Sequence, residues 1–154
     1  MHWPAGIPAE RHGTLEKQPA HLVDIMATAV DLAGAKYPER FHDNEIIPME
    51  GVSLRPAFTG QSLNRKQPIF WEHEGNKAAR EGQWKLVQKW RGPWELYDME
   101  ADRTELHDVS KEHPEIVSRL QAAWDGWAER AFVDEWKGPD HTDWGGDIKA
   151  KPID

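Results

Sequence analysis

Four short segments with β-strand character lie between residues 68 and 98, and their spacing restricts the possible folds more than any other feature. The predicted strands are residues 69–73, 77–80, 84–90 and 94–98. The connections between them are a few residues long and contain Gly75, Gly82 and Gly92, a residue type that accepts the backbone angles of tight turns. Parallel strands need a crossover of about a dozen residues or more. We therefore predict an antiparallel meander.

A long amphipathic helix is predicted over residues 114–131. Pro114 suits the first helical turn, and Glu115 favours the positive end of the helix. One apolar stripe runs along the segment through Ile116, Val117, Leu120, Ala123, Trp124, Trp127, Ala128 and Ala131. Together with the meander, this stripe predicts an α+β unit, in which a four-stranded antiparallel sheet packs on one long C-terminal helix.

A second amphipathic helix is predicted over residues 19–33, with Pro19 in its first turn and Gly34 after its end. Its apolar positions are Leu22, Val23, Ile25, Met26, Ala29, Val30, Leu32 and Ala33. This face needs a partner that the rest of the chain does not obviously supply. Residues 1–18 and 35–51 are predicted as loops, and Ser53 is expected to cap a short helix that ends at Phe58.

Composition excludes several classes of protein. The chain has 27 acidic residues against 19 Lys and Arg, a formal charge of −8, and no basic block, which disfavours nucleic acids and anionic membranes as partners. No apolar run is long enough to span a bilayer, and residues 1–6 do not read as a signal peptide. We therefore expect no membrane contact, and a periplasmic or a cytoplasmic location remains open. The absence of cysteine removes disulfides, thiolate zinc sites and cysteine nucleophiles.

Histidine and tryptophan are the remaining candidates for a site. The eight histidines show no zinc-type spacing, so we expect no metal site. There are nine tryptophans. Those inside the predicted elements are expected in the core, and exposed ones could instead stack on sugars.

Several motifs, taken together and in order, resemble one family. They are the runs 2–7, 21–26, 70–80, 84–87, 94–98 and 102–106, which read HWPAGI, HLVDIM, FWEHEGNKAAR, WKLV, WELYD and DRTEL. In this order they resemble the C-terminal part of type I, formylglycine-dependent sulfatases, the arylsulfatases of the alkaline-phosphatase-like superfamily.

The resemblance implies a division into three parts. Residues 1–60 would be the end of the large α/β catalytic domain, residues 61–136 the small C-terminal subdomain, and residues 137–154 an irregular tail. In a complete parent enzyme, helix 19–33 would lie against the large parallel sheet. The missing N-terminal domain is therefore the expected partner, and a second copy of this chain is the expected partner in its absence.

The resemblance does not bring the family's chemistry into this chain. The family forms formylglycine from Cys or Ser in a Cys/Ser-x-Pro/Ala-x-Arg motif, which this sequence lacks. Asp43-Asn44 has the letters of a calcium-binding pair, but it follows helix 19–33, whereas the family's pair precedes it. We expect no catalytic residue, metal ligand or cofactor here. Calcium, formylglycine and a sulfate-ester substrate belong to the expected parent enzyme.

The hairpin around residue 74 supplies the candidate site residues, which are His73, Glu74 and Asn76. In one interpretation, this hairpin reaches the mouth of the parent active site and contacts the leaving-group portion of the substrate. In the other, it is a tight turn held by side-chain-to-backbone hydrogen bonds, as Glu72 beside it also suggests.

Charged residues flank the last two predicted strands. Arg80, Lys85, Arg91 and Arg103 lie in sequence near Glu95, Asp98, Asp102 and Glu105. We expect weak ion pairs among them. Alternatively, the segment from Asp102 to Glu105 could hold a loop through bonds to backbone amides.

Three functions follow. The first is a part of an arylsulfatase that supports the catalytic domain and borders the substrate cleft, and that is inactive alone. The second is the same part of a phosphonate monoester or phosphodiester hydrolase. The third is a carbohydrate-binding module that uses exposed tryptophans.

Overall fold

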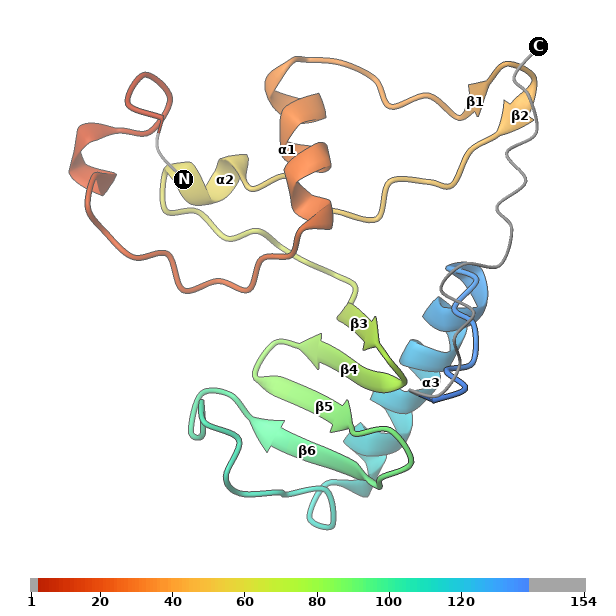
Figure 1. The fold of residues 1–154 in the computed structure, drawn as a ribbon. Coiled ribbons are helices and arrows are strands. Elements are labelled where there is room, and N and C mark those ends of the chain that lie inside the picture. The colour runs from red at the N-terminus through yellow and green to blue at the C-terminus, as the bar shows by residue number, and fades with distance from the viewer. Residues whose placement is uncertain (1–2, 139–154) are drawn as a thin grey trace. The chain divides into compact units, whose positions relative to one another are not determined.

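The computed structural model describes residues 3–138, and the chain divides after Lys66 into two compact units (Figure 1). Most of the predicted tail, residues 139–154, lies outside the described residues. No helix among those described is both long enough and apolar enough to cross a membrane. The two units are described separately below.

The second unit contains the predicted meander. Its strands are β3 (Ile69–His73), β4 (Asn76–Glu81), β5 (Trp84–Gln88) and β6 (Trp94–Asp98), and each pairs antiparallel with the next. Helix α3 (Pro114–Arg130) lies across one face of this sheet (Figure 1). The predicted fold of a four-stranded antiparallel sheet on one long helix is confirmed.

Three strand boundaries differ from the prediction, each for a local reason. Strand β4 ends one residue later than predicted, at Glu81, because this residue pairs with Trp84. Strand β4 begins at Asn76, because the turn consists of only Glu74 and Gly75, which both adopt positive φ. Strand β5 ends at Gln88 and not at Trp90, because the chain turns through Lys89 and Gly92, whose backbone groups are hydrogen-bonded at 2.7 Å.

The core of this unit lies between the sheet and α3. Strand pairing aligns Phe70, Ala79, Leu86 and Leu96 in one row across the sheet. Ala79, Leu86 and Leu96 are fully buried there together with Leu120 from α3, and Trp124 is 4% exposed. The expectation that tryptophans in regular elements pack in the core is confirmed for Trp124, and the partly buried Trp84, Trp94 and Trp127 pack against the buried cluster.

The first unit contains short elements. They are the 3-10 turn η1 (Ala9–Arg11), α1 (Val23–Leu32), the hairpin strands β1 (Arg40–Phe41) and β2 (Asn44–Glu45), and α2 (Arg55–Phe58). The predicted loop 35–51 is wrong over residues 40–45, where His42 and Asp43 form a two-residue turn with positive φ. Helix α2 begins at Arg55, one residue later than a helix capped by Ser53 would, and Ser53 Oγ accepts the Arg55 N–H at 3.2 Å.

Helix α1 begins at Val23, four residues after the predicted start at Pro19. The carboxylate of Asp24 explains this difference, because it accepts the backbone N–H of His21 at 2.7 Å and so satisfies a donor just ahead of the helix. Pro19 therefore precedes the helix and is not part of its first turn.

The same carboxylate joins three segments of the first unit. Asp24 is fully buried, accepts the Val52 N–H at 2.9 Å, and is paired with the guanidinium of Arg65. Burial alone would raise the pKa of Asp24, but the N–H groups of Val52 and His21 and the charge of Arg65 outweigh it and hold the pKa below its usual value.

The apolar face of α1 is exposed, and its polar face is the buried one. Leu22, Ile25 and Met26 are 76%, 60% and 58% exposed, whereas Asp24 and Thr28 are buried. Thr28 Oγ1 accepts the Leu54 N–H at 2.9 Å, and Asp31 accepts a bond from Ser53 Oγ at 2.6 Å. The segment that enters α2 therefore binds the polar side of α1, and the described residues leave the predicted apolar stripe uncovered.

We expect this chain to self-associate through α1. A patch with this many large apolar side chains drives association in water. Sedimentation velocity across the micromolar range should show a concentration-dependent dimer, and Ile25→Glu should shift it to monomer, whereas Asp125→Glu on the exposed side of α3 should not. A strictly monomeric wild type that unfolds cooperatively would contradict the prediction.

Candidate functional site

The β3–β4 hairpin carries the three predicted site residues. The side chains of His73 and Glu74 are 84% and 56% exposed, and His73 Nδ1 lies 4.0 Å from Glu74 Oε2. The turn is fixed from within, because Glu72 Oε1 accepts the Gly75 N–H at 2.8 Å. His73 and Glu74 are thus presented outward on a rigid turn.

Asn76 has a different environment from its two neighbours. Its Nδ2 donates to the carbonyl oxygen of His73 at 2.8 Å, and its Oδ1 accepts the Trp90 N–H at 3.1 Å. It therefore ties the β3–β4 turn to the β5–β6 turn at the same end of the sheet. Gly75 allows the close approach, since a Cβ there would lie 2.5 Å from the Trp90 indole. The side chain of Asn76 positions the hairpin.

A hollow of about 390 Å³ lies beside this hairpin. It is lined by Trp71, His73, Asn76, Lys77, Ala78, Val87, Gln88, Lys89, Glu95, Tyr97 and Glu105. Strand pairing places Trp71, Ala78, Val87 and Glu95 in one row across the sheet, next to the row that faces α3. Because side chains alternate between faces, this row belongs to the face opposite α3. The hollow was not predicted from the sequence, although the alternation of side chains along the strands predicts this row.

Charged groups at this face are arranged in local pairs. Lys85 is paired with Glu105, and the hydroxyl of Tyr97 donates to Glu95 Oε2 at 3.0 Å. Burial, assisted by the bond to Glu95, raises the pKa of Tyr97 to about 12, so this hydroxyl stays protonated at neutral pH.

The loop after β6 is held by carboxylates. Asp102 accepts the backbone N–H groups of Leu106 and His107 at 2.7 and 2.8 Å. These bonds, above all the one from the His107 N–H, stabilise the ionised carboxylate and hold the pKa of Asp102 below its usual value. The alternative interpretation of this segment, a loop held through backbone amides, is therefore confirmed for Asp102, and the predicted ion pairing is confirmed for Lys85 with Glu105.

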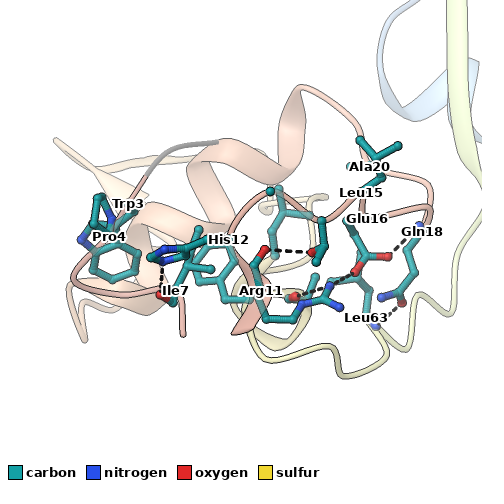
Figure 2. A pocket seen from close by; sticks show the side chains of 15 residues that line it. Trp3, Pro4, Ile7, Arg11, His12, Leu15, Glu16, Gln18, Ala20 and Leu63 are labelled. Carbon is teal, nitrogen blue, oxygen red and sulfur yellow. Dashed lines mark hydrogen bonds and ion pairs between the residues drawn. The ribbon is translucent and has the colours of Figure 1, made fainter. Parts of the chain in front are cut away.

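The first unit has a larger hollow, of about 680 Å³, between residues 3–20 and the segment from Leu54 to Leu63 (Figure 2). Its main polar side chains bond within the unit. Arg11 is 3.0 Å from Glu16, His12 Nε2 is 2.9 Å from the carbonyl oxygen of Ile7, and Gln18 Oε1 accepts the Leu63 N–H at 2.8 Å (Figure 2). Gln18 Nε2 also donates to the carbonyl oxygen of Gln61 at 3.0 Å. These bonds hold the N-terminal loop in place and do not converge on a ligand.

Within residues 3–138, no group of three or more His, Asp or Glu side chains is arranged to hold a metal ion. Asp43 and Asn44 lie at the exposed β1–β2 turn.

The comparisons with known proteins identify the relatives. No protein-family model matches the chain. The choline-sulfatase of Rhizobium meliloti is 33% identical over 63% of this chain and 19% of its own length. An N-acetylgalactosamine-6-O-sulfatase of Bacteroides thetaiotaomicron is 27% identical over 78% of this chain and 25% of its own length. The crystal structure of Ps i-CgsB matches 84% of this chain and 28% of its own, with 30% identity and a TM-score of 0.68.

These matches confirm the resemblance seen in the motifs. The chain is related to the C-terminal part of sulfatases of the alkaline-phosphatase-like superfamily. It spans about a fifth to a quarter of the length of these curated relatives.

Proposed function

We propose that this chain is the part of an arylsulfatase-type sulfuric ester hydrolase that supports the catalytic domain and borders the substrate cleft. The observation that carries the proposal is the match to Ps i-CgsB, which extends through both units of the chain. The apolar face of α1 is a suitable surface for the catalytic domain, because its exposed side chains need an apolar partner. Calcium and formylglycine would belong to that domain.

The substrate would be a sulfate ester, and His73 and Glu74 would contact its leaving-group portion. Both side chains project from a turn that is fixed by Glu72 and Asn76. A rigid turn is a suitable element for positioning a substrate. A sulfated oligosaccharide is the favoured substrate, because Ps i-CgsB was also crystallised in complex with k-i-k-neocarrahexaose. The packing of four tryptophans around α3 favours this function over a tryptophan-based binding module.

The isolated chain should hydrolyse no aryl sulfate. It contains no cysteine and no serine in the Ser-x-Pro/Ala-x-Arg frame from which the family forms its nucleophile. Incubation with 4-nitrophenyl sulfate, with and without calcium, should release nitrophenol at the rate of buffer. Turnover that copurifies with the chain through successive columns would contradict this expectation.

A chimera tests the role of the hairpin. In the choline-sulfatase of R. meliloti, the matched segment is replaced by that of this chain, and turnover of choline sulfate is measured. His73→Ala should lower kcat/KM about tenfold, mainly through KM, which corresponds to the loss of about 1.4 kcal/mol of substrate binding.

His107→Ala provides the matched control for this chimera. Its side chain is 81% exposed and lies 3.6 Å from the carboxylate of Asp102, so it resembles His73 in exposure and in its acidic neighbour. The control should change kcat/KM less than twofold. An active chimera in which both variants behave alike would place the hairpin outside the cleft.

A further inference from the structure

We propose that the hollow on the sheet face opposite α3 binds an uncharged sugar ring of an oligosaccharide. This inference rests on the proposed function, and it adds a binding site beyond His73 and Glu74. The hollow combines an aromatic wall, an apolar floor and polar groups at its rim. These are the usual components of a small-molecule site.

The shape of the hollow follows from the row of residues that crosses it. Ala78 on β4 pairs with Trp71 on β3 and with Val87 on β5, and Val87 pairs in turn with Glu95 on β6. Because alanine carries a single methyl group, space remains over β4 between the indole of Trp71 and the side chains of β5 and β6. An indole ring and the apolar floor fit the C–H face of a pyranose ring.

The polar groups fit hydroxyls better than they fit an anion. Tyr97 donates to one oxygen of Glu95, and a carboxylate has further acceptor capacity for sugar hydroxyls. Lys85 is paired with Glu105, and Glu95 and Lys89 line the hollow with opposite charges. The ammonium of Lys77, a third lining residue, lies over the Trp124 ring, 4.4 Å from its centroid. With charges of both signs around it, the hollow has no excess positive charge for a sulfate group.

The position of the hollow connects it to the hairpin. His73 and Asn76 line the hollow and also form the hairpin, so one ligand could extend from the turn onto the sheet. The ring bound in the hollow would then be a neighbour of the sulfated ring. Because the hollow lies on paired strands, its walls are preorganised.

Binding to the intact chain tests this proposal. The probes are k-i-k-neocarrahexaose and its chemically desulfated form, titrated calorimetrically. We expect both to bind, with dissociation constants within threefold of each other. Ala78→Leu should weaken both at least tenfold by filling the hollow, and Glu95→Gln should weaken both about fivefold by removing the charged acceptor.

Ala122→Leu is the matched control, because Ala122 is exposed on α3 and the substitution adds the same atoms away from the hollow. It should bind both probes as the wild type does. Near-ultraviolet circular dichroism checks that the variants keep the packed sheet. If Ala78→Leu loses this packing, the test depends on Glu95→Gln alone.

Three results would overturn the proposal. They are no binding of either probe at millimolar concentration, binding of the sulfated probe alone, and binding that neither Ala78→Leu nor Glu95→Gln weakens. This binding experiment measures no turnover. The proposed function is tested by the activity of the chimera, so the failure of one proposal can be told apart from the failure of the other.

Discussion

Replacing Asp24 by alanine should destabilise the first unit by about 3–5 kcal/mol, the range found when one partner of a buried ion pair is removed. The substitution leaves the part-buried guanidinium of Arg65 without its counter-charge, and it removes the acceptor from the N–H groups of His21 and Val52. Hydrogen exchange of the α1 amides, followed by mass spectrometry, measures the loss directly.

The control for this variant is Asp43→Asn, which removes a carboxylate at the exposed β1–β2 turn and keeps a residue type that tolerates positive φ, and which should change stability by less than about 0.5 kcal/mol. Protection of α1 that is unchanged in Asp24→Ala would show that Asp24 does not hold the three segments together.

The pH dependence of the first unit follows from the same carboxylate. The pKa of Asp24 is lower in the folded state than the value of about 3.9 for an unfolded chain. The ionised carboxylate therefore contributes its full stabilisation above pH 4, and the contribution is lost as the pH falls through the folded pKa. The wild type should lose protection of α1 in this acidic range, whereas Asp24→Ala should show a smaller change.

The second large effect is expected at Trp124. Its indole is buried between α3 and the sheet, against Trp94 and Trp127, at centroid distances of 6.4 and 5.9 Å. Trp124→Ala should lower the free energy of unfolding of the second unit by about 3–5 kcal/mol, because it removes a large buried side chain and leaves a cavity. Urea denaturation measures the change.

A graded variant separates packing from hydrogen bonding at this position. Trp124 Nε1 donates to the carbonyl oxygen of Trp71 at 3.0 Å, and Trp124→Phe keeps an aromatic ring while it removes this donor. We expect a smaller loss for Phe than for Ala. A loss below about 1 kcal/mol for Trp124→Ala would mean that the stripe of α3 does not pack on the sheet.

The second unit was predictable because its signals are local. Glycines at 75 and 82 mark turns with positive φ, and the alternation in 94–98 defines β6. Two of the three shifted boundaries lie at the turn of Glu74 and Gly75 and at the turn through Lys89 and Gly92, which the bond from the Trp90 N–H to Asn76 links. Such a bond depends on the approach of two turns, which the sequence does not encode locally.

The first unit was less predictable because burial depends on what lies opposite a helix. The apolar stripe of α1 predicted the helix, but the residues that the described chain buries are Asp24, Ala27 and Thr28. At the candidate site, the sequence predicted His73 at the end of a strand and Glu74 on the turn that follows it. It could not show the hollow, which arises from the missing side-chain volume at Ala78 and from the pairing of four strands.

The uneven distribution of indole rings has a spectroscopic consequence. Of the nine tryptophans, only Trp3 precedes residue 67. The indoles of Trp94, Trp124 and Trp127 lie close enough for their electronic transitions to couple. Near-ultraviolet ellipticity should therefore follow the second unit, whereas the peptide band reports on both. The melting of two units in one polypeptide could thus be recorded separately without an attached dye.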